Sequence, residues 1–106
     1  MNTKTVQYTI SPECKDGLSS MSEELTLSQG RVLSILIMGI SDQHDFPEWT
    51  RPPRAATRER KAITFRMDPP AYTRLVELAS ISGRPMGRLI DYIVSTHRIA
   101  FNVVEV

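Results

Sequence analysis

The sequence has very little of what marks secreted domains and membrane proteins. Its single cysteine, Cys14, excludes an internal disulfide and favours a reducing, intracellular compartment. The longest apolar run, "VLSILIMGI" at 32–40, is far shorter than the roughly 20 residues that a transmembrane helix needs. No signal-peptide pattern opens the chain. We therefore expect a soluble, cytoplasmic protein.

The patterns of metal sites and catalytic centres are also missing. His44 and His97 are far apart in the sequence, and no cluster of cysteines or carboxylates has the spacing of metal ligands. The chain has neither a glycine-rich loop of the phosphate-binding type nor a nucleophile elbow. These absences predict a protein that is not an enzyme and that carries no cofactor.

Basic residues are scarce in the first half of the chain and acidic residues are scarce in the second. The formal net charge is only +1, yet residues 1–50 contain three Lys/Arg against seven Asp/Glu, whereas residues 51–106 contain ten against five. Such asymmetry indicates contact with a nucleic acid or another acidic surface.

What the sequence does contain is a faint internal repeat. Residues 5–37 align with residues 62–94 without a gap, at a constant offset of 57 residues (62 minus 5). Identity at this level is close to chance, so the pattern of residue types has to support the repeat. The four identical positions are Pro12/Pro69, Leu18/Leu75, Gly30/Gly87 and Arg31/Arg88.

Each copy of the repeat predicts a strand followed by two helices. Apolar residues at 6, 8 and 10, and again at 63, 65 and 67, give the alternation of half-buried strands. Ser11-Pro12 and Asp68-Pro69 then each offer an N-cap oxygen and a proline for the first helical turn. Apolar residues recur at helical spacing after both prolines, and again at 32–37 and 89–94.

The end of the first helix differs between the copies. Gly83 suits the left-handed position that follows a helix, whereas its counterpart Thr26 lacks that freedom. Thr26 is instead a candidate start of the next helix, because Thr26 and Gln29 fit a capping box, although Ser28 is the better N-cap.

The chain divides into a first repeat at 1–40, a linker at 41–60, a second repeat at 61–97 and a tail at 98–106. The linker contains three prolines and little periodicity. Phe46 and Trp49 within it either pack on the domain or mark a contact surface. The apolar tail has three alternatives, namely an edge strand, a cover for the core or a binding site for a protein partner.

A lone strand leaves a row of backbone donors and acceptors unpaired, so we expect the two copies to pair their strands within one chain. The linker raises the local concentration of the partner strand to about the millimolar range, which favours intramolecular pairing. The sequence therefore predicts a mainly α fold with a short two-stranded antiparallel ribbon laid over four interlocked helices, the two repeats forming one folded unit.

The strand and the following "DPPAYTRLVELASISGRPMGRLIDYIV", with their upstream equivalent, resemble the ribbon-helix-helix DNA-binding family in two tandem copies. The resemblance covers 4–40 and 61–97. It implies that the ribbon enters the major groove of double-stranded DNA and that the N-terminus of each second helix holds a phosphate. Family members usually combine two chains, so this chain is expected to act as a pseudo-dimer.

The alternation gives the candidate base contacts. With the apolar residues inward, Thr5, Gln7 and Thr9 face outward in the first copy, and Ala62, Thr64 and Arg66 in the second. A solvated sheet face would suit the same residues, whereas the resemblance favours contact with DNA. The expected base-contacting residues are Thr5, Gln7, Thr9, Thr64 and Arg66.

Candidate phosphate contacts lie beside the strands and at the second helices. Pro85 stands where the family usually has Ser or Thr, which is a departure from its pattern. Gly30 and Gly87 allow either close approach of a phosphate backbone or tight packing between crossing helices. The expected phosphate-contacting residues are Lys4, Ser28, Gln29, Gly30, Arg58, Arg60, Lys61, Arg84, Met86 and Gly87.

These features predict a sequence-specific double-stranded DNA-binding protein of a plasmid or phage type, most simply a transcriptional repressor. The resemblance leaves two alternatives open: a plasmid-transfer (relaxosome) accessory DNA-binding protein and an antitoxin-like protein-interaction module. Further assembly of several copies on DNA is also compatible with the sequence.

Overall fold

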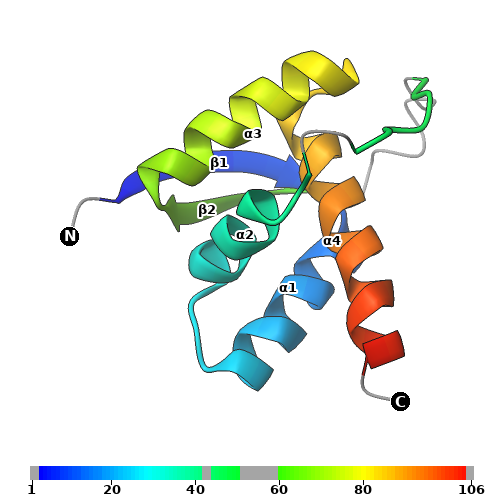
Figure 1. Ribbon diagram of the computed structural model, residues 1–106. Helices are drawn as coiled ribbons and strands as arrows, with labels where there is room; N and C mark the ends of the chain where they lie inside the picture. Colours follow the sequence, from blue (N-terminus) through cyan, green and yellow to red (C-terminus); the bar gives the residue numbers. More distant parts are fainter. Residues whose placement is uncertain (1–2, 42–43, 51–59, 105–106) are drawn as a thin grey trace.

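The chain forms a strand followed by two helices, and then repeats that order (Figure 1). The computed structural model describes residues 3–41, 44–50 and 60–104, with side chains as far as residue 96. The prediction of a mainly helical fold with a two-stranded antiparallel sheet is confirmed. The elements are β1 (Lys4–Ile10), α1 (Pro12–Leu25), α2 (Gln29–Met38), β2 (Lys61–Met67), α3 (Pro69–Ser82) and α4 (Met86–Val104).

The register of β1 and β2 is symmetric about its centre. Lys4 lies opposite Met67 at one end of the ribbon, and Ile10 lies opposite Lys61 at the other. The central pair is Gln7 and Thr64, which occupy equivalent positions at the 57-residue offset. This register is the one expected if a two-fold axis relates the two strands.

The inner face of the ribbon closes one side of the core. Ile10, Phe65 and Met67 are buried, while Val6 and Ile63 pack against them and remain partly exposed. The alternation of buried and exposed residues along both strands matches the period of two in the sequence.

A single apolar core joins the two repeats. The second helix of each repeat packs against the strand of the other, α2 on β2 and α4 on β1, and α1 lies beside α4 below the ribbon in Figure 1. Because both repeats contribute to one cluster, neither half holds a complete core. Its most deeply buried side chains are Ile10, Leu18, Val32, Leu33, Ile37, Met67, Leu75, Leu78, Leu89, Ile90, Ile93 and Val94.

Two expectations about the helix ends were wrong. Thr26 does not begin α2; it ends α1 in the left-handed conformation, with φ of 57° and ψ of 39°, like Gly83 at the end of α3. Asp68 does not cap α3 with its side chain, because its carboxylate binds Arg31 instead. Ser11, by contrast, accepts a hydrogen bond from the amide of Cys14 as expected, at 3.1 Å.

The linker is more than a plain tether, and the tail does not form an edge strand. Phe46 packs against the core beside Tyr92, with ring centroids 5.5 Å apart, while Trp49 is partly exposed. α4 continues to Val104, so residues 98–104 are helical and the edge-strand alternative does not hold there. Among the described residues, no helix is long and apolar enough to cross a membrane.

Candidate functional site

The outward face of the ribbon carries six exposed side chains in three cross-strand pairs. Thr5 lies opposite Arg66, Gln7 opposite Thr64, and Thr9 opposite Ala62. Five of the six belong to the predicted base-contacting set, and Arg66 is the charged member. The face therefore combines hydroxyl, amide and guanidinium groups on one two-stranded ladder.

The start of each second helix lies against the strand of the other repeat. A Cβ atom at Gly30 would lie 2.2 Å from the carbonyl oxygen of Arg66, and one at Gly87 would lie 2.1 Å from that of Thr9. No real side chain tolerates such distances to backbone, so both positions require glycine. The two glycines thus serve a helix–strand contact, a third role beside the two that the sequence suggested.

These contacts set the N-termini of α2 and α4 at the two ends of the ribbon. Ser28 caps α2 by accepting a hydrogen bond from the amide of Arg31 at 3.2 Å, which makes it the N-cap rather than Thr26. The side-chain amide of Gln29 donates to Ser19 at 3.1 Å, and Met86 packs against the core. Both second helices therefore start beside the outward face.

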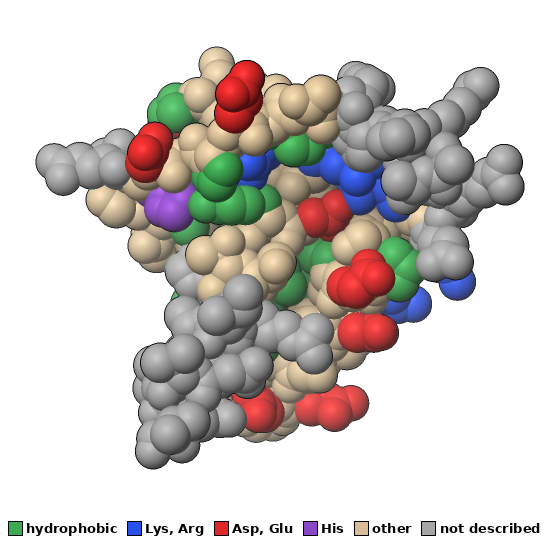
Figure 2. Space-filling view, turned by 90° about the vertical axis from the view of Figure 1, so that its right-hand side faces the viewer, with side chains coloured by type: hydrophobic (Ala, Val, Ile, Leu, Met, Phe, Trp, Pro, Cys, Tyr) green, Lys and Arg blue, Asp and Glu red, His purple; other side chains and the backbone are tan. Residues whose placement is uncertain are grey.

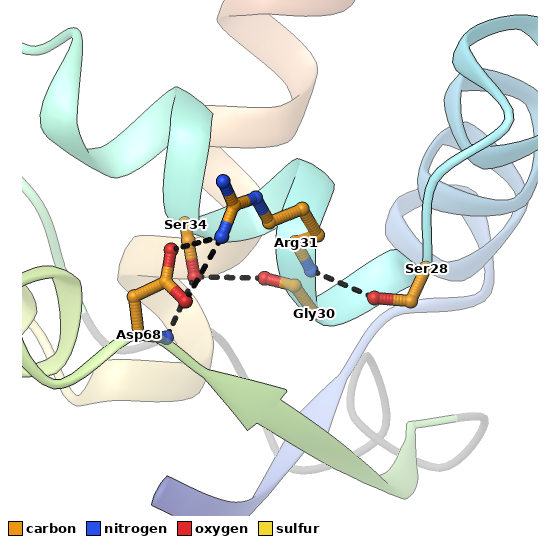
Figure 3. A network of polar contacts seen from close by, with 5 residues as sticks. All are labelled: Ser28, Gly30, Arg31, Ser34 and Asp68. Carbon is orange, nitrogen blue, oxygen red and sulfur yellow. Dashed lines mark hydrogen bonds and ion pairs between the residues drawn. The ribbon is translucent and has the colours of Figure 1, made fainter. Parts of the chain in front are cut away.

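A polar network fixes the start of α2 to the end of β2 (Figure 3). Arg31 donates to both carboxylate oxygens of Asp68, at 3.0 and 3.2 Å. The hydroxyl of Ser34 donates to the carbonyl of Gly30 at 2.9 Å and accepts from the amide of Asp68 at 3.2 Å. The network therefore holds the first turn of α2, which contains Gly30, in place against β2.

The equivalent network in the other half uses a partly buried carboxylate. Asp91, the counterpart of Ser34, accepts a hydrogen bond from the amide of Ser11 at 3.0 Å. It also forms an ion pair with Arg60, whose Nη2 donates to the carbonyl of Thr9 at 2.6 Å. Because the Arg60 side chain is only 9% exposed and already paired, it holds the fold together and leaves the predicted phosphate-contacting set.

Arg84 is also placed inside the molecule. Only 7% of the residue is exposed, and its guanidinium lies 4.3 Å from the ring centre of Tyr92. One nitrogen donates to the carbonyl of Pro47 at 2.9 Å. Arg84 therefore also leaves the predicted phosphate-contacting set, because the linker covers it.

Lys4 and Lys61, two of the predicted phosphate contacts, lie at opposite ends of the ribbon. Both are exposed, and the Nζ atom of Lys4 sits 4.5 Å above the ring of Tyr72. Arg58 lies outside the described residues. Exposed carboxylates concentrate on α1, at Glu13, Asp16, Glu23 and Glu24, and Figure 2 shows acidic side chains spread over the lower right of the face on view.

The sequence reasoning missed Arg31 as a functional candidate. Its side chain is 50% exposed in the first turn of α2, and it follows Gly30, which lies against the backbone of Arg66. The signal was present, because Arg31 and Arg88 are one of the four identities between the repeats.

No group of three metal-ligating side chains is found in the described part of the chain.

Comparisons of the chain with protein families, with curated proteins and with solved structures give no match. A functional proposal therefore has to rest on the residues themselves.

Proposed function

We propose that this chain is a tandem ribbon-helix-helix protein that binds double-stranded DNA and acts as a transcriptional repressor. The observation that supports it most directly is the symmetric ribbon centred on Gln7 and Thr64, with all six outward side chains exposed. The major groove is about 12 Å wide and admits a two-stranded ribbon.

Three kinds of contact divide the work in this proposal. Arg66 donates two hydrogen bonds to a guanine, and Gln7 forms a bidentate pair with an adenine. The threonines form hydrogen bonds to base edges or contact thymine methyl groups. The N-terminal amides of α2 and α4 hold backbone phosphates on either side of the groove. Lys4 and Lys61 add charge that is independent of sequence, whereas the half-exposed Arg31 would have to exchange Asp68 for a phosphate.

The second repeat is expected to contribute more to sequence preference than the first. Arg66 offers a charged fork, whereas Thr5, Gln7 and Thr9 are neutral. The exposed carboxylates of α1 also repel phosphates that come near that helix. A bound site is therefore expected to be asymmetric.

The test is a selection of binding sites from random duplex DNA with the full-length chain, followed by titration of the selected duplex by fluorescence anisotropy. A recovered motif, tighter binding to it than to a scrambled duplex, and weakening with salt are the expected results. Failure to enrich any motif, together with no binding to duplex DNA at low salt, would refute the proposal. Expression of a reporter under the selected site then separates repression from an accessory role.

A further inference from the structure

A hollow lies at one corner of the molecule, where β1 turns into α1 and the second repeat enters β2. Its volume is about 470 Å³, within the range of roughly 300–1,000 Å³ that small-molecule pockets occupy. Its lining combines apolar side chains with three cationic residues and one acidic residue, Asp16. The lining residues are Ile10, Ser11, Pro12, Lys15, Asp16, Arg60, Lys61 and Ile63.

The internal repeat explains why this corner is hollow. The offset of 57 residues makes Tyr72 the counterpart of Lys15 and makes Lys4 the counterpart of Lys61. In the second repeat, the half-buried Tyr72 ring lies under Lys4, whose Nζ atom is 4.5 Å from the ring centre. In the first repeat, Lys15 is exposed and has no ring to place in the same corner. We call the corner that holds the Tyr72 ring the filled copy of the site, and the hollow beside Lys15 and Lys61 the unfilled copy.

The filled copy indicates what the unfilled copy accepts. In the filled copy a phenol ring lies under an ammonium group, and a cation over a ring contributes about 0.5–2 kcal/mol. The unfilled copy supplies the same ammonium from Lys61 and adds the flexible side chain of Lys15, whose position in the repeat is that of Tyr72. For neither lysine do the described residues provide a salt-bridge partner. Arg60 is committed to Asp91, so its charge is already neutralised.

We propose that this hollow binds a small planar aromatic anion. The ring occupies the place that Tyr72 fills in the other half, against Ile10 and Ile63 and beneath Lys61, and the anionic group pairs with Lys15. The site does not depend on the proposed DNA binding, and no nucleic acid enters its test.

The experiment uses 4-hydroxybenzoate as the probe, because it joins the phenol ring of tyrosine to a carboxylate. Titration of the full-length chain, followed by amide chemical shifts, should give saturable changes at Ile10, Lys61 and Ile63 with a Kd of about 1 mM. Acetate and p-cresol, which each lack one half of the probe, should bind at least about tenfold more weakly. An absence of saturable shifts with 4-hydroxybenzoate overturns the proposal.

Two variants and a control decide where the probe binds. Lys15→Tyr fills the hollow with the side chain that its counterpart already accommodates, so it should fold and lose the saturable shifts. Lys61→Met should weaken binding about fivefold or more, whereas Lys4→Met, at the equivalent position of the filled copy, should bind like the wild type. Unchanged affinity in Lys61→Met, or in a folded Lys15→Tyr, overturns the proposal.

Discussion

At the scale of single residues, Arg66 has the most direct bearing on the proposed DNA recognition. It is exposed on the outward face, and Met67 beside it is fully buried and fixes the direction of the strand. If it forks onto a guanine, Arg66→Ala should cost about 1–3 kcal/mol at the selected site and relax preference mainly at one base pair. Anisotropy titrations on cognate and scrambled duplexes at two salt concentrations measure this.

The matched control for Arg66 is Lys61→Ala at the edge of the ribbon. A phosphate contact carries no sequence information, so this variant should weaken all duplexes about equally and reduce the salt slope by about one. Melting curves of both variants should stay close to the wild type, because both side chains are exposed. Wild-type binding by Arg66→Ala on both duplexes would show that the ribbon is not the reading surface.

Gly87 is a residue on which the fold itself depends. Gly87→Ala places a methyl group 2.1 Å from the carbonyl oxygen of Thr9, so helix α4 must move off the ribbon. We expect a loss of about 1–3 kcal/mol or more in the free energy of unfolding, measured by urea denaturation. Gly39→Ala is the control, since its added Cβ would meet only ordinary contacts at 3.5 Å. Equal stability of the two variants would contradict the close contact.

Cys14 couples stability to alkaline pH. Burial, followed by the nearby charge of Asp91, raises the pKa of its thiol above the usual value. The folded chain therefore keeps a proton that the unfolded chain loses above about pH 8.5, and stability falls by about 1.4 kcal/mol per pH unit beyond that point. Below about pH 8.5 this contribution is fully present.

Cys14→Ala removes this alkaline loss and is structurally mild, because the equivalent residue Ala71 is fully buried at the same position of α3. Urea denaturation of both chains at about pH 8 and about pH 9.5 should show a smaller decrease for the variant. Parallel decreases in the two chains would assign the pH dependence to other groups.

At the scale of the elements, the junction between α1 and α2 is strained where that between α3 and α4 is relaxed. Thr26 adopts φ of 57°, which costs a residue with a side chain roughly 1–2 kcal/mol, whereas Gly83 adopts φ of 68° freely. Thr26→Gly should therefore stabilise the chain by up to about 1 kcal/mol after the added entropy of unfolded glycine is subtracted. Gly83→Thr should destabilise it by a similar amount. Thermal melting of both variants measures these opposite changes in stability. A loss of stability in Thr26→Gly would contradict the strain at Thr26.

The elements were predictable to the extent that their signals are local. Alternation in the strands gave the outward set, and the repeat gave the pairing of the two strands, whereas the register that centres on Gln7 and Thr64 is known only from the structure. The fates of Arg60 and Arg84 were not predictable, because they depend on Asp91 and Tyr92, which only the folded chain brings near. A basic side chain in a sequence gives no sign of whether a carboxylate or a ring will cover it.

At the scale of the whole molecule, the repeats have diverged in chemistry while keeping one geometry. The amides that begin α1 and α3 are each bound by the second helix of the other repeat, through Asp91 in one case and Ser34 in the other. The same positions therefore do the same structural work with a charged and a neutral group. The two corners have diverged in the same way, since Tyr72 lies under Lys4 in one and Lys15 takes the equivalent position near Lys61 in the other.

The same interlocking predicts that half of the chain cannot fold alone as a monomer. In residues 61–106, β2 would lose the hydrogen bonds to β1, and α4 would lose the strand against which Gly87 packs. The fragment should be unfolded at low concentration, or fold only as a homodimer that supplies a second ribbon strand. Sedimentation velocity and circular dichroism over a range of concentrations distinguish these outcomes, with the full-length chain expected to stay folded and monomeric throughout. A stable, folded monomer of the fragment would show that the second repeat holds a sufficient core of its own and would remove the basis for treating the chain as a pseudo-dimer.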